Sequence, residues 1–555
     1  MADLEISEEE DGDFDLAGDA VQQSNVPSPS EQSSSCTDNS EDDESSSQNH
    51  RMFWEKCERF EGLQVTFSPT EVAEHNEKQI MDYFQQYFDL AFFKDTSELT
   101  NMRYLQQTGR SLKLSAKELR VFIGATILMS CLRYPRVRMY WGKTTRVISI
   151  TEIMTRDQHF TIRSNLKVID DNAVTEETRR KDKLWKIRPL LERVKRACLS
   201  LPRSPEVAVD EQMIPFTGAC AIKQFVRGKP NPEGLKNFVL AAPSGLVLDF
   251  EIYQGKETFP EAIGQQLKQG IGAPAVLRLC QSLPEGTHVF FDRYFTSVPL
   301  LESLAEKNLP ATGTIMKSRI PRAVHLTADK ILANQGRGSV DQTVRKDKLI
   351  SIVKWYDQKP VITASTKVGK NPMDQCKRWS KKDRRYIQVR RPAVISCYNK
   401  NMGGTDLIDR MMSFYRVCTR TKKWTVKTIF HFIDLGIANS WIQYRSDRIK
   451  NDEPKKNILQ YLDFKIRIPE HLLRGQEEQH SDEDDEESTP KRRRLLPPQS
   501  PSPSVTHLPE MTGLKNSMRC KNSGCTKKIK IRCKGCSVFL CLTSQKNCFS
   551  EYHQK

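Results

Sequence analysis

Residues 205–316 carry the pattern that most constrains the fold of this 555-residue chain. Upstream of them the apolar residues recur with helical spacing, but "EVAVDEQMIPF" alternates and is typical of a strand. "NFVLAAPSGLVLDFEIY" then predicts a hairpin closed by a Pro-Ser-Gly turn. Helical "PEAIGQQLKQGIG", apolar "THVFFD", helical "SVPLLESLAEKN" and extended "ATGTIM" follow. The predicted order is three strands, a helix, a strand, a helix and a strand.

That order matches an RNase H-like fold, in which the first and fourth strands lie side by side. Residues 317–395 interrupt the pattern; they are basic, rich in Gly and Lys, and contain a β-pair in "LISIVKWYDQKPVITAST". We therefore predict an inserted β-rich subdomain. Residues 51–204 and the segment after 418 have mostly helical patterns, so the chain is expected to be a multidomain α/β protein.

Charge is distributed unevenly along the chain. Residues 1–50 contain fifteen Asp and Glu but no Lys or Arg, and their composition predicts disorder. Because the whole chain carries +16, removing that −15 leaves +31 on the remaining residues. A body this basic favours a polyanionic partner, most simply nucleic acid, over a merely well-solvated surface.

No membrane or secretory segment is predicted. The N-terminus is acidic, unlike a signal peptide, and the longest apolar run, "VFIGATILMSCL", is too short to span a bilayer. Ser115 and Glu118 precede that run in a capping-box pattern, which predicts a buried helix.

Aspartates occur at strand ends of the predicted core. Asp210 is expected to close the first strand and Asp292 closes the fourth, so the two should meet in this fold. Asp406 and Asp409 follow Gly403-Gly404; on a helix they would share a face, and a helix after the last strand could bring Asp406 to the same spot. Each aspartate alone could be satisfied structurally, Asp406 and Asp409 as acids in a first helical turn. Together they would repel unless divalent cations neutralise them, as in two-metal phosphoryl transfer.

Four blocks of the sequence resemble the piggyBac family of DNA transposases. They are "VDEQMIPF", "QFVRGKPNPEGLKNFVLA" with "LDFEIYQGK", "FFDRYFTSVPLL" and "YNKNMGGTDLIDRMMSFYR", in the family's order. The match runs from roughly residue 80 to 445, with a terminal cysteine cluster added. The resemblance implies that Asp210, Asp292 and Asp406 form a DDD-type catalytic triad holding Mg²⁺ or Mn²⁺, with Asp409 as an additional essential aspartate.

The same resemblance implies the activity and the partners. Members cut transposon ends through a hairpin made by 3′-hydroxyl attack and insert at TTAA, acting as dimers on double-stranded DNA. All four acids are present here. The alternatives are a domesticated, non-catalytic nuclear DNA-binding protein that keeps the scaffold, and a zinc-module adaptor that binds chromatin proteins.

The expected domains combine these patterns with the resemblance, which also implies that one dimerisation and DNA-binding domain is assembled from segments before and after the core. They are a disordered acidic N-terminus (1–50), the helical dimerisation and DNA-binding domain (51–204 and 419–474), the RNase H-like catalytic core (205–316 and 396–418), the β-rich insertion (317–395), a disordered linker (475–506) and a cysteine-rich zinc-binding domain (507–555).

Two basic segments are candidate DNA contacts. "RTKKWTVK" places Trp424 among cations, so that its ring could stack on an unpaired base, or could instead anchor the next helix in the core. The second segment surrounds a Pro/Gly-rich turn, where a solvated turn is nearly as good an explanation. The candidate residues are Arg420, Lys422, Lys423, Trp424, Arg227, Lys229 and Lys236.

The C-terminal segment is crowded with metal-ligand types. Six of the fifteen cysteines lie within residues 520–548, which indicates metal rather than disulfides, whereas the other nine are scattered like reduced thiols. With His553 they give seven candidates, too many for one tetrahedral zinc and one short of two. The eighth candidate, His507, rests on resemblance to the His-containing stretch that opens the family's cysteine-rich domain. The expected ligands of a cross-braced pair of Zn²⁺ ions are His507, Cys520, Cys525, Cys533, Cys536, Cys541, Cys548 and His553.

Two spacings differ from those of the family, which puts Cys525 and Cys548 most in question as ligands. A RING-like or PHD-like module is the rival interpretation, because those modules also cross-brace. The module would bind end DNA in a transposase and chromatin protein in an adapted one. "PKRRR" in the linker predicts nuclear localisation, with a charge-balanced linker as the alternative.

Overall fold

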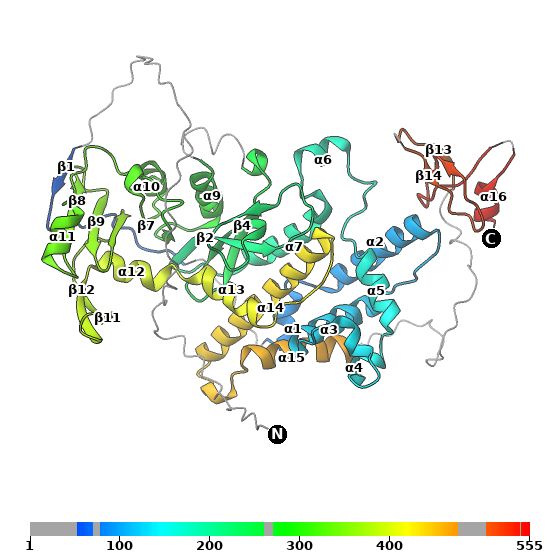
Figure 1. Ribbon diagram of the computed structural model, residues 1–555, viewed down its shortest axis with the longest axis horizontal. Helices are drawn as coiled ribbons and strands as arrows, with labels where there is room; N and C mark the ends of the chain where they lie inside the picture. The colour runs from blue at the N-terminus through cyan, green and yellow to red at the C-terminus, as the bar shows by residue number, and fades with distance from the viewer. Residues whose placement is uncertain are drawn as a thin grey trace, which may run out of the picture.

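The computed structural model of the protein describes residues 53–69, 78–259, 270–474, 507–514, 516–543 and 545–554 (Figure 1). The predicted acidic N-terminus and the linker with its PKRRR patch lie outside these residues. Most of the helix predicted at 260–272 does too, and the described helix there is α9 (Gly272–Leu279).

Five strands form the centre of one large sheet, in the order β5-β4-β2-β6-β7. β2, β6 and β7 are parallel, whereas β4 is antiparallel to both β2 and β5. This is the predicted RNase H-like order, and the α/β fold class is confirmed. The strands are β2 (Glu206–Pro215), β4 (Glu233–Ala241), β5 (Val247–Ile252), β6 (His288–Phe291) and β7 (Ala311–Thr314).

The β4–β5 hairpin has the predicted turn. Gly245 adopts φ +90°, a conformation that favours glycine, and its N–H donates to the Ala242 carbonyl at 2.9 Å. The short β3 (Gln224–Phe225) pairs with the start of β4.

The inserted segment continues the same sheet. β10 pairs antiparallel with β7, β9 with β10, and β8 with β9, while β1 from the N-terminal side pairs with β8. A separate hairpin of β11 and β12 projects from this end (Figure 1). The elements are β1 (Trp54–Lys56), α11 (Asp329–Gln335), β8 (Val340–Arg345), β9 (Ser351–Tyr356), β10 (Pro360–Ser365), β11 (Asp374–Ser380) and β12 (Arg385–Arg391).

Helices cover both faces of the central strands, which explains why these strands are apolar on both sides. On one face, Val239 of β4 joins a core cluster with α7, α13 and α14. On the other, Phe238 and Leu240 join a cluster with α9 and α10. The helices are α7 (Arg188–Leu199), α10 (Val298–Ala305), α12 (Ala393–Asn401), α13 (Gly404–Phe414) and α14 (Trp424–Lys450).

Segments from before and after the core pack together in the helical part: α1 against α14, and α3 against α15. α3 begins with the predicted capping box, in which Ser115 Oγ accepts from the Glu118 N–H at 3.1 Å and the Ser115 N–H donates to the Glu118 carboxylate at 2.9 Å. The helices are α1 (Ile80–Gln85), α2 (Leu90–Thr108), α3 (Ala116–Leu132), α4 (Ile148–Thr151), α5 (Arg156–Asn165), α6 (Glu176–Lys181) and α15 (Tyr461–Arg474). No helix in the described ranges is long and apolar enough to cross a membrane.

The C-terminal segment forms a small module of short strands and one helix. It contacts the helical part through Tyr552, whose hydroxyl donates to the Gly109 carbonyl at 2.6 Å, and through Arg532, which donates to Asn172 at 2.7 Å. Its elements are β13 (Pro509–Met511), β14 (Met518–Arg519), β15 (Lys528–Ile529), β16 (Ile531–Cys533) and α16 (Cys548–His553).

Candidate active site and candidate metal centres

Asp210 and Asp292 lie on adjacent parallel strands. The register of β2 and β6 ends at the pair Val209 and Phe291, and one aspartate follows each of these residues. The expectation that Asp210 closes its strand was wrong: β2 continues to Pro215, because β4 still pairs with it there. Asp210 instead marks the point where the pairing with β6 ends.

Helix α13 brings Asp406 and Asp409 toward β2. Gly404 allows this approach, because a Cβ built on it would lie 2.3 Å from the Ala242 carbonyl oxygen in the β4–β5 turn. A Cβ on Gly403 would meet nothing within 4 Å. Asp406 lies in the first turn of α13, where it also complements the helix dipole. The structural and the functional interpretations of this acid are therefore compatible.

Two side chains that are not aspartates face the cluster. Burial alone would lower the pKa of Lys229, but the negative charges of Asp210, Glu211, Asp406 and Asp409 raise it above its usual value. Burial raises the pKa of Tyr398, on α12, and the charges of Asp292, Asp210 and Asp406 raise it further. The electrostatic influence of the three aspartates thus converges on one phenol.

Nearby cations and hydrogen bonds only partly offset the effect of burial on the aspartate carboxylates. Burial raises the pKa of Asp210 to about 7 against the opposing charge of Lys229. Burial also raises the pKa of Asp292, although the Tyr294 N–H donates to its carboxylate at 2.9 Å. Burial raises the pKa of Asp409 to about 6, opposed first by its hydrogen bond from Gln212. A bound cation would stabilise these carboxylates in their charged form.

The donor set suits a hard cation. Carboxylate oxygens are the protein ligands that Mg²⁺ and Mn²⁺ prefer, and Asp210, Asp292 and Asp406 supply only such atoms. Within the described ranges, the oxygens of these three residues do not all lie within 4.8 Å of one another, whereas two groups of ligands in the C-terminal module do. The aspartate cluster is the more open arrangement.

A network of buried polar side chains on β2, β4 and α14 is hydrogen-bonded to Asp409. Gln212 donates through Nε2 to Asp409 Oδ1 at 2.6 Å, and its Oε1 lies 3.0 Å from His431 Nε2 and 3.3 Å from Asn237 Nδ2. Gln212, Asn237 and His431 are all buried. Sequence reasoning missed this network, although residues two apart on a strand share a face, so Gln212 had to lie beside Asp210.

The basic residues around the predicted turn occupy different environments. Arg227 is exposed, as a DNA contact would require. Lys229 instead donates to the Glu211 carbonyl at 3.1 Å, within the acidic cluster. Lys236 lies 4.0 Å from the Glu211 carboxylate and above the Tyr294 ring, 4.2 Å from its centroid. Both lysines thus adjoin the aspartates rather than forming a separate surface.

The segment before α14 is mixed as well. Arg420, Lys422 and Lys423 are all exposed, and Lys423 also donates to the Ser164 carbonyl. Trp424 is half-buried and packs against the helical core at the first position of α14. The ring therefore has a packing role and retains a solvent-accessible part.

The eight predicted C-terminal ligands fall into two groups of four. His507, Cys533, Cys536 and His553 form one group, and Cys520, Cys525, Cys541 and Cys548 form the other; within each group the ligand atoms lie within 4.8 Å. Along the chain the groups interleave, which is the cross-braced arrangement. In the second group, the backbone amide of Lys527 lowers the pKa of the Cys525 thiol to about 7, whereas burial raises the pKa of the Cys541 thiol.

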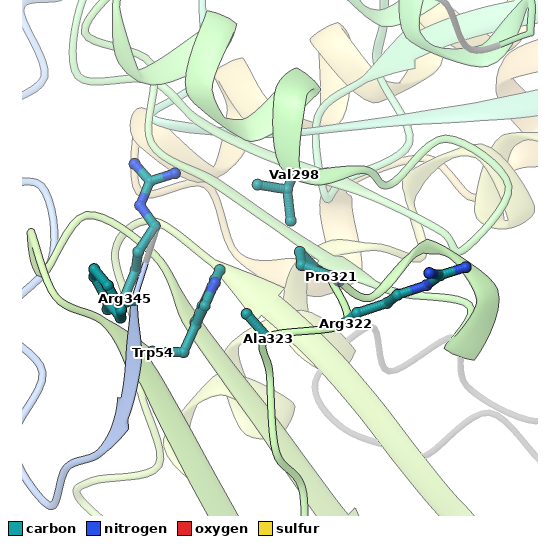
Figure 2. A pocket seen from close by; sticks show the side chains of 7 residues that line it. Trp54, Val298, Pro321, Arg322, Ala323 and Arg345 are labelled. Carbon is teal, nitrogen blue, oxygen red and sulfur yellow. The ribbon is translucent and has the colours of Figure 1, made fainter. Parts of the chain in front are cut away.

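A mostly apolar pocket of about 390 Å³ lies apart from both the aspartate cluster and the C-terminal module, beside β1 and α10 (Figure 2). Arg345, one of its lining residues, is paired with Glu302 and Asp347. No aspartate of the cluster lines it. The lining residues are Phe53, Trp54, Val298, Pro321, Arg322, Ala323 and Arg345.

Comparison with known proteins adds independent findings. The family model described as transposase IS4 matches residues 80–441. The human PiggyBac transposable element-derived protein 3 is 30% identical over 463 residues, which cover 81% of this chain and 72% of that protein. The human PiggyBac transposable element-derived protein 2 is 30% identical over 372 residues, covering 65% and 61% respectively.

A solved structure has a similar fold. It is titled as a cryo-EM structure of the piggyBac transposase synaptic complex with hairpin DNA, and it matches with a TM-score of 0.60 at 18% identity. The match covers 74% of this chain and 83% of the solved one.

Proposed function

Because the chain belongs to the piggyBac family of transposases and transposase-derived proteins, we propose that it cleaves and joins DNA strands at Asp210, Asp292 and Asp406. One observation carries the proposal: Asp210 and Asp292 follow the last paired residues of the adjacent strands β2 and β6, and the charges of both, with that of Asp406 on α13, act on half-buried Tyr398. Separate structural roles would not require carboxylates from three distant segments to converge.

Each residue of the cluster has a distinct proposed role. Asp210, Asp292 and Asp406 would hold divalent cations, which would supply activation of the attacking oxygen and stabilisation of the leaving oxygen in phosphoryl transfer. Asp409 supports the cluster from the next turn of α13. Lys229, fixed against Glu211, places a positive charge where a phosphate would approach.

The DNA steps and the assembly follow from the family. The proposed substrates are transposon ends processed through a hairpin and a TTAA target, bound by a homodimer in the nucleus. Exposed Arg227, Arg420 and Lys422 would neutralise phosphates, and the accessible part of Trp424 would stack on an unpaired base. Two Zn²⁺ ions would complete the C-terminal module, which binds end DNA.

Cleavage of defined DNA tests the proposal. The genomic sequence flanking the gene supplies candidate ends, as inverted repeats bounded by TTAA. Purified full-length protein with Mg²⁺ or Mn²⁺ should nick these ends and form hairpins, whereas Asp210→Asn and Asp406→Asn should bind them without cleaving. Asp157→Asn is the matched control, because Asp157 is exposed on α5 and, within the described part of the chain, its one ion pair is with its neighbour Arg156. Activity of the Asp210→Asn and Asp406→Asn variants equal to that of the parent would refute the assignment.

A second function is favoured by the relatives' names, since both human proteins are called transposable element-derived. In that case the chain is a nuclear DNA-binding protein without catalysis, or an adaptor in which the zinc module binds chromatin protein. Specific binding of DNA without nicking, at any Mg²⁺ or Mn²⁺ concentration, would select the first. Binding of chromatin protein by the module, without DNA binding, would select the second.

A further inference from the structure

The β11–β12 hairpin is a two-faced ribbon with one largely buried face and one exposed face. Residues 374, 376, 378 and 380 point inward, and residues 375, 377 and 379 point outward, with their cross-strand partners on the same faces. On the inner face, Cys376 and Val389 are buried in a cluster with Trp355 of β9. This cluster attaches the ribbon to the large sheet.

The inner face also contains two arginine–aspartate ion pairs. Arg378 binds Asp357 at 3.0 Å, and Arg391 binds Asp374 at 2.6 Å. Asp374 accepts a further hydrogen bond from Ser396 Oγ, in the first turn of α12, at 2.9 Å. The base of the hairpin is thereby fixed to the helix that carries Tyr398 of the aspartate cluster.

The outer face combines aromatic, amide and cationic side chains without a carboxylate. Trp379 and Tyr386 are directly opposite each other, with ring centroids 5.3 Å apart, and are 47% and 71% exposed. Every side chain on this face is exposed: Gln375, Lys377, Trp379, Tyr386, Gln388 and Arg390.

The tip adds further cations. Lys381, Lys382 and Arg384 are exposed, and the one carboxylate there, Asp383, accepts from Ser380 Oγ at 2.7 Å. Among the described residues, none of the five cations of the tip and outer face forms an ion pair with a carboxylate. The tryptophan–tyrosine pair leaves aromatic surface in contact with water, and exposed apolar surface of this kind marks interaction sites.

We propose that the outer face and tip of the β11–β12 hairpin bind DNA at unpaired bases. The rings of Trp379 and Tyr386 present π-faces on which such bases stack, while Lys377, Arg390 and the cations of the tip neutralise the adjoining phosphates. The inference deepens the proposed function, on which it rests only in taking DNA as the partner. It assigns the insertion a role in holding strands that have been opened near the aspartate cluster.

Binding measurements without catalysis test the inference. Full-length protein without added Mg²⁺ or Mn²⁺ is titrated by fluorescence anisotropy with a paired duplex and with the same duplex containing a run of unpaired thymines. Trp379→Ala/Tyr386→Ala should weaken binding to the unpaired probe by about 5- to 150-fold for each base that loses its stacking, and leave the duplex unchanged. Lys381→Ala/Lys382→Ala/Arg384→Ala should weaken both probes and reduce the slope of log affinity against log salt by about 0.7–0.9 per lost phosphate contact.

Two controls separate stacking from folding. Trp379→Phe/Tyr386→Phe keeps two rings and should retain most of the binding to the unpaired probe. Phe53→Ala removes an aromatic side chain that is 64% exposed outside the hairpin and should change neither probe. Equal losses on both probes for the aromatic variant would overturn base stacking. No loss for either the aromatic or the charge variant would overturn the whole inference and leave an acidic protein surface as the partner. A parent that binds neither probe would instead refute the proposed function.

Discussion

The side-chain amide of Gln212 donates to Asp409 at 2.6 Å. Its oxygen faces the side chains of Asn237 on β4 and His431 on α14. Burial lowers the pKa of His431 well below its ordinary value, so its ring is neutral at physiological pH. The Asp409 carboxylate can only accept, so it fixes the amide nitrogen of Gln212 toward itself and leaves Oε1 toward His431 Nε2. The neutral ring of His431 must then carry its proton on Nε2, so Asp409 sets the tautomer of a histidine on α14.

Gln212→Met should impair metal use more than DNA binding. It keeps the side-chain length but removes the donor to Asp409, and losing such a supporting hydrogen bond typically costs about 10- to 100-fold in metal affinity or activity. Single-turnover cleavage against Mn²⁺ concentration measures the effect. The control is Gln335→Met, because Gln335 is exposed at the end of α11. Parental cleavage at the parental Mn²⁺ requirement would contradict the positioning role.

The two neighbouring glycines should respond oppositely to alanine. Gly404→Ala places a Cβ against the Ala242 carbonyl, so α13 must shift; overpacking of this kind costs about 1–3 kcal/mol of stability and should reduce cleavage. Gly403→Ala has open space and an ordinary φ of −76°, so it should be neutral or stabilise by about 0.4–1 kcal/mol. Thermal unfolding and cleavage of both variants check this. Equal thermal stability and equal cleavage by the two variants would show that close packing at Gly404 does not position Asp406.

Each C-terminal ligand group should hold one zinc ion. Full-length protein should contain two zinc ions per chain by elemental analysis, and Cys533→Ser should both remove one and weaken the other. The second loss is expected because Cys533 lies between ligands of the opposite group, Cys525 and Cys541, along the chain. Competition with a chromophoric chelator measures the remaining site. Cys57→Ser, outside the module, should retain two ions, and a parent with a single zinc would exclude the paired arrangement.

Acid should destabilise the helical part through His159. Its ring packs between Phe122 and Trp141, and burial, aided by Arg163, lowers its pKa to about 3. The unfolded chain therefore takes up a proton that the folded chain does not as pH falls from about 6.5 to 3, and stability falls by about 1.4 kcal/mol per pH unit in that window. His159→Phe should lose this part of the pH dependence between pH 7 and 5. His471→Phe, at an exposed site, is the control for thermal unfolding, and a parental pH slope in His159→Phe would contradict the prediction.

The sequence predicted those features that local pattern controls. The strand order from Glu206 to Thr314, the capping box of Ser115 and the turn at Gly245 all depend on periodicity or on single-residue conformations. Grouping of the cysteines and histidines into two sets of four was likewise expected from their number and spacing together with the family resemblance.

The pairing of segments that lie far apart in the sequence could not be predicted from local pattern. Nothing local indicates that β2 pairs with β4 as far as Pro215 but with β6 only as far as Val209, or that the insertion joins the core sheet through β10. The position of Lys229 among carboxylates was missed for the same reason, because its segment is a loop in sequence and meets β2 only after folding. Tyr398 was within the quoted resemblance, but its position beside the aspartates depends on α12 packing against β2 and β7.

The pairing of β10 with β7 also protects the protein from self-association. In the five-strand core alone, β7 would be an edge strand whose free N–H and C=O groups could template pairing with another chain. The pairs Thr363 with Thr314 and Ser365 with Thr312 cover that edge. Deleting the insertion would therefore remove more than a DNA-binding hairpin, since it would expose a ready site for intermolecular β-sheet growth and make the truncated protein prone to aggregate.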